Sequence, residues 1–142
     1  MAHLTLGQAE AAIDAALQKG RELGLKPLTV AALDAGGHLI ALKRQDGASN
    51  LRPQLAIGKA AGALALGVSS RAIGEMAAER PTFVAALGPI ASQGLIPAAG
   101  GVIVVDGDGN VIGAIGATGD SSDNDEACVL AGLLVANLLA KP

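Results

Sequence analysis

Two glycine-rich turns, each opening with an aspartate and lying between apolar runs, constrain the fold more than any other feature. The first is DAGG at residues 34–37, between LTVAAL and HLIALKR, and the second is DGDGN at residues 106–110, between VIVV and VIGAIGA. Aspartate and glycine in a short turn between two strand-like runs are typical of an antiparallel hairpin. DGDGN also resembles part of a calcium-binding loop, but the alternating oxygen ligands and the downstream acid of such a loop are absent. The sequence therefore predicts two β-hairpins.

Helical signals flank and separate the two hairpins. Thr5 can cap a first helix, with Gln8 completing a capping box, and an apolar stripe continues towards Gly24, a residue suited to ending a helix. Further helical segments are expected at 51–66, at 71–79 after a cap at Ser69 or Ser70, and from a cap at Ser121 or Ser122 to Leu138. A short helical turn is expected at 82–87. The predicted order of elements is α-β-β-α-α-β-β-α.

This order indicates the fold class. Because strand–helix–strand alternation is not sustained along the chain, a doubly wound parallel sheet is disfavoured. Two hairpins with helices between them predict an α+β fold, in which helices cover an antiparallel sheet. No linker, repeat or low-complexity tail interrupts residues 1–142, and we expect them to form one domain.

The composition of the chain argues against several classes of protein. The net charge of −3 without a dense basic patch, and a single aromatic residue, Phe83, argue against a nucleic-acid-binding protein. No apolar run is long enough to cross a membrane, and the N-terminus lacks the pattern of a secretory signal. One cysteine, Cys128, excludes an internal disulfide and agrees with a cytoplasmic location. Since 51% of residues are hydrophobic and only 16% are charged, subunits are expected to cover each other in a homo-oligomer.

The end of the second hairpin is one candidate binding site. Gly116, Thr118 and Gly119 lie at or near the end of an apolar strand, and a helix starts soon after them. Backbone amides at a helix start can bind a carboxylate or a phosphate. The alternative is that side chains such as Ser121 and Asp123 satisfy those amides as ordinary caps.

A polar island in an otherwise apolar chain is a second candidate. Arg44 and Asp46 follow the first hairpin, while Arg52 and Lys59 lie in or just before the second helix. Arg44 could bind a carboxylate through two hydrogen bonds, and Lys59 could add a point charge. The alternative is an internal ion pair of Arg44 or Lys59 with Asp46.

The two histidines are the candidate metal ligands. His38 could be an axial ligand to haem iron or a general base, or it could simply face solvent beside the hairpin turn. His3 is a poorer candidate because it lies near the terminus. Cys128 fits a small core residue better than a nucleophile, since no neighbouring base is evident.

Several motifs taken together point to a known family. They are RQDGA at 44–48, GG at 100–101, and GAIGATG followed by the acids at 125–126. With these motifs the chain resembles, over nearly its whole length, the GlcG/HbpS family of haem-binding-protein-like domains, which also occur at the end of some PduO-type proteins. The resemblance implies a profilin-like fold, assembly into dimers or larger oligomers, and haem as a ligand of some members. Thr118 stands where the family commonly has a serine.

The leading hypothesis is an oligomeric, cytoplasmic small-molecule-binding domain with haem as its ligand. The ligand would lie between the glycine-rich strand end (Gly116, Thr118 and Gly119) and the polar island. Arg44 and Lys59 would bind its carboxylates, and His38 or Thr118 would approach the metal.

Two other hypotheses remain open at this stage. The first is an enzyme, an isomerase or a hydrolase, that acts on a small carboxylated metabolite. Lys59 would then orient the carboxylate, and Asp125 or Glu126 would act as acid and base. The second is an accessory subunit that binds no ligand.

Overall fold

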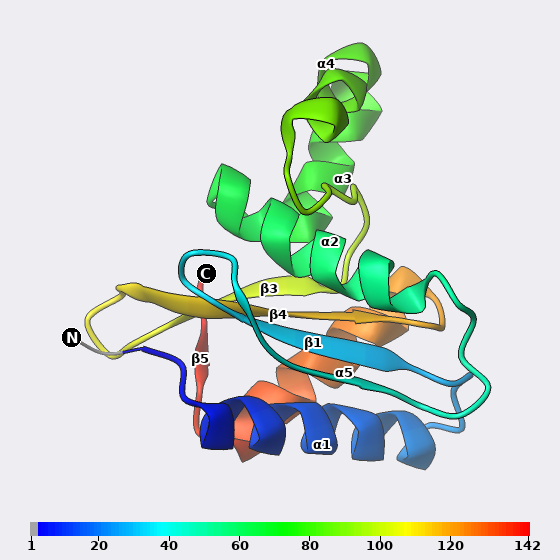
Figure 1. Ribbon diagram of the computed structural model, residues 1–142, viewed down its shortest axis with the longest axis vertical. Coiled ribbons are helices and arrows are strands. Elements are labelled where there is room, and N and C mark those ends of the chain that lie inside the picture. Colours follow the sequence, from blue (N-terminus) through cyan, green and yellow to red (C-terminus); the bar gives the residue numbers. More distant parts are fainter. Residues whose placement is uncertain (1–2) are drawn as a thin grey trace.

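The computed structural model describes residues 3–142, in which helices pack against a β-sheet (Figure 1). The elements in chain order are α1 (Leu6–Glu22), β1 (Thr29–Asp34), β2 (Leu39–Arg44), α2 (Arg52–Leu66), α3 (Ser70–Glu79), α4 (Pro81–Leu87), a 3-10 turn (Gly88–Ile90), β3 (Gly101–Val105), β4 (Val111–Thr118), α5 (Ser122–Val135) and β5 (Leu139–Ala140). The predicted α+β class and the order of its main elements are confirmed.

The five strands form a single antiparallel sheet in the order β2-β1-β4-β3-β5. Each predicted hairpin is present, as β1 with β2 and as β3 with β4. The two hairpins join through β1 and β4, which run antiparallel with Thr29 opposite Thr118 and Asp34 opposite Gly113. The two central strands therefore come from different hairpins.

Helices cover both faces of the sheet. α1 and α5 pack on one face, where the main core forms from residues that include Ile13, Val30, Ile115 and Leu133. α2 lies on the other face (Figure 1). Gly116 lets the backbone of α2 approach β4 closely, because a Cβ atom there would collide with the carbonyl oxygen of Ala56. The sheet is thus the middle of three layers.

The helix starts follow the local signals in the sequence. Thr5 and Gln8 form the predicted capping box. Ser69 caps α3 and Ser121 caps α5, each accepting a hydrogen bond from a backbone amide. Local side-chain hydrogen bonds of this kind stabilise a helix start by about 1 kcal/mol.

The last helix is shorter than the sequence predicts. α5 ends at Val135, and Asn137 adopts a left-handed conformation with φ of 57°. Leu138 was expected to belong to the helix, but it lies beyond it and is buried in the core. The chain then adds β5 to the edge of the sheet beside β3. Helical periodicity could not reveal this exit, because Leu138 is apolar in either arrangement.

α3 and α4 form an arm that projects from the body of the molecule (Figure 1). The arm contacts the body mainly through α2, and Arg80 lies over the ring of Phe83, 4.0 Å from its centre. Phe83 and Ile90 remain exposed. No helix within residues 3–142 is both long and apolar enough to cross a membrane.

Candidate functional site

Lys59 and Asp125 form an ion pair in the interior. The Lys59 Nζ lies 3.2 Å from Asp125 Oδ2 and also donates a hydrogen bond to the carbonyl oxygen of Ala117 at 3.0 Å. The other carboxylate oxygen of Asp125 accepts a hydrogen bond from the amide of Asp120 at 2.9 Å. The two side chains are only 4% and 1% exposed. The predicted alternative, an internal ion pair for Lys59, is therefore present, but its partner is Asp125 and not Asp46.

The electrostatics of the pair follow from burial. Burial is the largest influence on Lys59 and lowers its pKa, whereas the charge and hydrogen bond of Asp125 act in the opposite direction. The positive charge of Arg52 lowers the pKa of Lys59 a little further. With its hydrogen bonds made to Asp125 and to the backbone, Lys59 joins α2 to β4 and α5.

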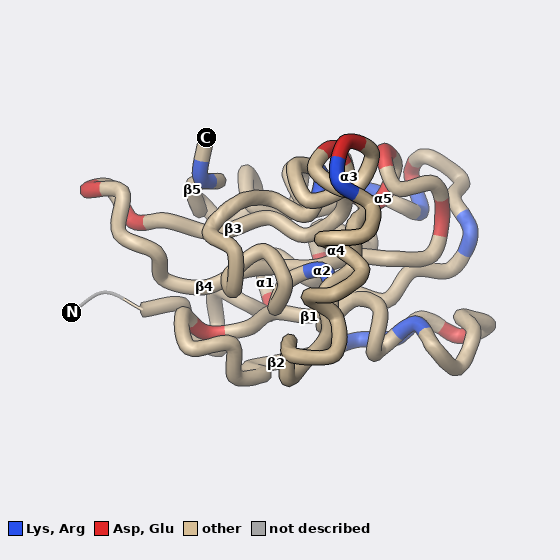
Figure 2. Tube along the Cα trace, turned by 90° about the horizontal axis from the view of Figure 1, so that it is seen from above, with Lys and Arg blue, Asp and Glu red and all other residues tan. Residues whose placement is uncertain are grey.

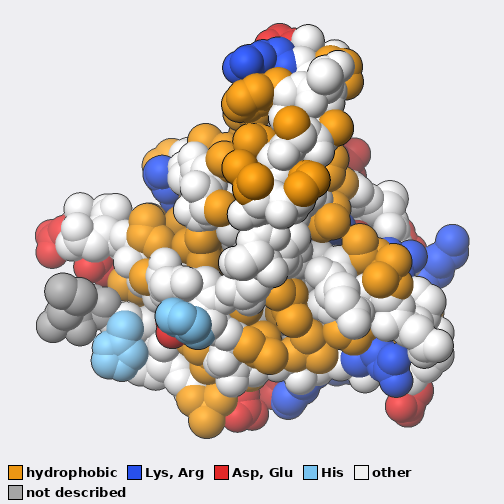
Figure 3. Space-filling model, turned by 45° about the horizontal axis from the view of Figure 1, so that its top comes forward, with side chains coloured by type: hydrophobic (Ala, Val, Ile, Leu, Met, Phe, Trp, Pro, Cys, Tyr) orange, Lys and Arg blue, Asp and Glu red, His pale blue; other side chains and the backbone are white. Residues whose placement is uncertain are grey.

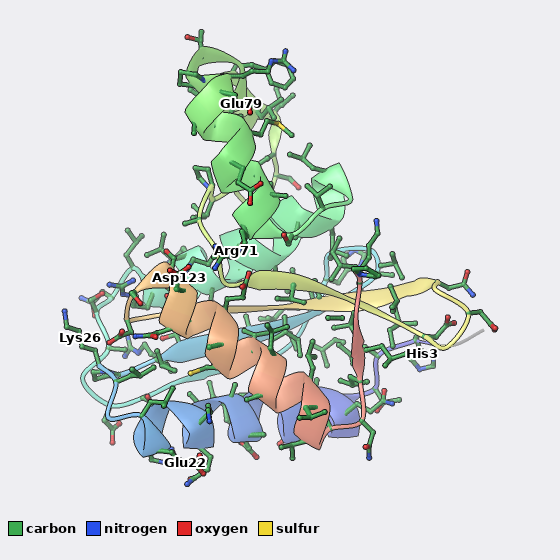
Figure 4. The ribbon with its side chains drawn as sticks, turned by 180° about the vertical axis from the view of Figure 1, so that it is seen from behind. His3, Glu22, Lys26, Arg71, Glu79 and Asp123 are labelled. Carbon is green, nitrogen blue, oxygen red and sulfur yellow. The ribbon has the colours of Figure 1, made fainter. Side chains whose placement is uncertain are left out.

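The second acid proposed for catalysis belongs to a different cluster. Arg71 of α3 donates from Nε to both carboxylate oxygens of Glu126 at 3.1 Å, and from Nη2 to Asp123 at 2.5 Å. Figure 4 shows Arg71 beside Asp123 at the start of α5. Asp125 and Glu126 are adjacent in sequence, but they bind cations on two different helices.

Thr118 is buried and its hydroxyl has a partner. Arg52 donates from Nη1 to the Thr118 hydroxyl at 2.7 Å, and Thr118 is 1% exposed. Thr29, opposite Thr118 in the sheet, is fully buried, and its hydroxyl has no hydrogen-bond partner within the described part of the chain. The sequence placed Arg52 in the polar island, but its contact with Thr118 depends on tertiary packing and was missed.

The glycines of this strand end serve close packing. Gly119 has a φ of +147°, and a Cβ atom there would collide with the carbonyl oxygen of Pro27. The helix start that follows is capped by Ser121, so the capping alternative describes the first turn of α5. Hydrogen bonds from Asn124 and from the backbone amides of Ser121 and Lys26 lower the pKa of Asp120 to about 2.

Arg44 lies at the same end of the sheet as Thr118. Both residues are opposite Thr29, one on each neighbouring strand, so the structure brings the two predicted ends together. The side chain of Arg44 is exposed and makes no hydrogen bond or ion pair within residues 3–142. It lines an open groove of about 670 Å³, which we call the arginine groove. The walls of the groove include Leu17, Arg21, Leu25, Pro27, Arg44 and Asp46.

His38 lies at the opposite end of the sheet. It precedes β2, whereas Arg44 ends that strand, so the two residues are separated by roughly 17 to 20 Å of extended chain. The His38 ring is 79% exposed, and its Nδ1 lies 3.2 Å from Asp34 Oδ1. A pocket of about 730 Å³ lies between the two hairpin turns, and both His38 and His3 line it. The structure therefore separates His38, the proposed metal ligand, from Arg44, the residue proposed to bind a carboxylate.

Charges are distributed differently at these two ends. The turn between β3 and β4 carries acidic residues and no basic ones, whereas basic residues end β2 (Figure 2). Asp34, Asp106 and Asp108 line the pocket that contains His38, and no lysine or arginine lines it. The hydrogen bond from the His38 amide is the largest influence on Asp34 and lowers its pKa, which keeps this carboxylate ionised. Within residues 3–142, no cluster of three or more histidine, cysteine or acidic side chains is arranged to hold a metal ion.

The fold and these sites define the class of protein: an α+β domain with a five-stranded antiparallel sheet between helices and an open pocket at each end of the sheet. A family model described as haem degrading protein HbpS-like matches residues 4–134. The chain belongs to this family, as its motifs indicated.

Solved structures agree with this assignment. HbpS is 31% identical over 95% of this chain and 91% of that protein, with a TM-score of 0.81. PduOC, solved as a haem complex, is 20% identical over 99% of this chain and all of that one, with a TM-score of 0.87. The Klebsiella pneumoniae protein ORFY is 23% identical over 96% and 93%, with a TM-score of 0.85. The last two share the fold at low identity. The comparison with curated proteins found no match.

Proposed function

We propose that this chain is a haem-binding domain and that His38 binds the haem iron. Membership of the HbpS-like family and the haem complex of PduOC support the choice of ligand. The side chains that ligate haem iron in proteins are mainly histidine, cysteine, methionine and tyrosine. Cys128 is buried, Met76 lies on α3 away from the pocket lining, and the chain has no tyrosine. His38, by contrast, is exposed and faces a pocket.

The main structural support for this proposal is the contact between the Asp34 carboxylate and the Nδ1 atom of His38. A carboxylate that accepts a hydrogen bond from one ring nitrogen fixes the tautomer and leaves the other nitrogen free to bind a metal. Asp34 is held in place, because its Oδ1 also accepts backbone hydrogen bonds from Gly36 and His38 at 2.9 Å. When Nδ1 carries the proton, Nε2 of His38 is therefore the free nitrogen.

The pocket around His38 is large enough for a small-molecule ligand. Its volume of about 730 Å³ falls within the usual range of ligand pockets. Both histidines of the chain lie on the same face of the molecule (Figure 3). Because aspartates line the pocket without a basic residue, haem carboxylates would find no counter-charge there. Binding would then depend on iron coordination and on apolar contact, and so on His38.

Haemin titration of the purified protein tests the proposal. We expect a shifted Soret band for the natural sequence and its loss in His38→Ala, because the iron ligand is removed. Asp34→Asn should weaken binding by about 10- to 100-fold, the range found when a carboxylate supporting a metal ligand is changed. Asp14→Asn alters an exposed aspartate of α1 that pairs with Lys43 and serves as the control. An unchanged Soret shift in His38→Ala would contradict the role of His38, and no shift for the natural sequence would contradict haem binding.

We further propose that the chain acts as a homo-oligomer in the cytoplasm. Large apolar side chains remain exposed at the end of α5 and on β5, with Leu134 79%, Val135 67% and Leu139 54% exposed. Burying such side chains against another copy would remove apolar area from water. Light scattering coupled to size-exclusion chromatography is expected to give a mass above that of one chain. A monomer at micromolar concentration would contradict this proposal.

A further inference from the structure

The arginine groove is a second concave site, and the haem proposal does not use it. It lies between the C-terminal half of α1 and the end of β2, at the opposite end of the sheet from His38. Its wall is held in place by two hydrogen bonds between Gln45 and Leu28. The backbone amide of Gln45 donates to the carbonyl oxygen of Leu28 at 2.9 Å, and the side-chain oxygen of Gln45 accepts from the backbone amide of Leu28 at 2.7 Å. The groove is thus built on paired backbone and not on a free loop.

Two arginines, Arg21 and Arg44, give the groove a net positive charge. Arg44 has no partner within the described residues, and Arg21 donates only to the neutral amide of Gln18. Lys43 differs, because it lies 2.7 Å from Asp14 and 3.9 Å from Glu10. Asp46 is the single acid in the lining. A guanidinium without a partner is well suited to binding a carboxylate through two parallel hydrogen bonds.

The rest of the lining is aliphatic. Leu17 is buried in the core with one edge at the groove, and Leu25 and Pro27 form the adjoining wall. No aromatic side chain lines the groove, so a flat ring would have nothing on which to stack. The surface therefore combines a cationic rim with an aliphatic floor.

We propose that the arginine groove binds an aliphatic monocarboxylate, with the carboxylate on Arg44 and the hydrocarbon chain over Leu17, Leu25 and Pro27. Arg21 adds positive charge from the α1 wall. The groove volume of about 670 Å³ is large enough for such a molecule. Nothing in this site requires a metal or haem, so it is independent of the function proposed above.

Titration of the full chain with octanoate, followed through its backbone amide NMR signals, tests this site. We expect saturable shifts at Leu25, Gln45 and Asp46, with a Kd below about 1 mM. Acetate, which lacks the chain, and octan-1-ol, which lacks the charge, should each bind more weakly. Arg44→Gln should weaken octanoate binding by about fivefold and Arg21→Gln by about twofold, as expected for exposed charge pairs.

Two controls separate the possible outcomes. Arg80→Gln changes an exposed arginine of the arm and should leave octanoate affinity unchanged. His38→Ala should also leave it unchanged, so failure of the haem proposal and failure of this one are distinguishable. Shifts confined to the exposed Leu134 and Val135, equal affinity in Arg44→Gln, or no saturable shift at all would overturn the proposal.

Discussion

Replacing Lys59 with methionine is expected to lower the free energy of unfolding by about 3 to 5 kcal/mol, the range found when one partner of a buried ion pair is removed. The substitution leaves the carboxylate of Asp125, which is 1% exposed, without its cation. It also leaves the carbonyl oxygen of Ala117 without the lysine hydrogen bond. Since the chain has no tryptophan or tyrosine, urea unfolding followed by far-ultraviolet circular dichroism is the suitable measurement.

Two further variants make this result interpretable. Lys59→Met combined with Asp125→Leu should recover much of the loss, because no unpaired charge is then buried. Lys43→Met removes the lysine of an exposed pair, in which the lysine is 44% exposed, and should cost no more than about 1 kcal/mol. If Lys59→Met and Lys43→Met had equal effects, the pair with Asp125 would not be the tertiary link described here.

Gly116→Ala is expected to have the second large effect, a destabilisation of about 3 kcal/mol or more. The added methyl group would meet the carbonyl oxygen of Ala56 and the amide nitrogen of Ala60, both of which are backbone atoms of α2. A flexible side chain could move aside, but here the whole helix would have to shift from the sheet. The same urea unfolding experiment measures the loss.

Gly107→Ala provides the matched control for this substitution. Gly107 lies in the turn between β3 and β4, where an added Cβ atom would have no neighbour within 4 Å. Its stability change should stay within about 0.5 kcal/mol, as is usual for surface substitutions. A Gly116→Ala variant as stable as Gly107→Ala would mean that α2 and β4 are less closely packed than the structure indicates.

The parts of the fold that local sequence predicts are those that local hydrogen bonds stabilise. Asp34 and Asp106 each accept hydrogen bonds from amides within their own turn, so the two hairpins were recognisable from a few residues each. The same is true of the helix caps at Thr5, Ser69 and Ser121. In these places, the residues that determine the structure are close together in the sequence.

Only part of the arrangement of the candidate sites could be predicted in this way. We expected Arg44 and Thr118 beside one ligand, and they do share one end of the sheet, but the separation of His38 from both was not expected. The pairing of β1 with β4 decides that Arg44 and Thr118 share one end of the sheet while His38 lies at the other. Lys59 binds Asp125, 66 residues away, and no local pattern distinguishes that acid from Asp46. The acids at 123 and 126 gave a weak indication of the Arg71 cluster. They lie three residues apart on a predicted helix, so their side chains can share one cation.

The central position of β1 also affects how this chain can fold. One edge of β1 pairs with β2 across a short turn, whereas its other edge pairs with β4, which lies much later in the chain. Contacts that close long loops form later than local ones. On the ribosome, the first hairpin therefore emerges with one backbone edge of an apolar strand unpaired until β4 has been synthesised. An unpaired apolar edge of this kind is prone to pair with other chains, so the first hairpin is exposed to aggregation until β4 covers it.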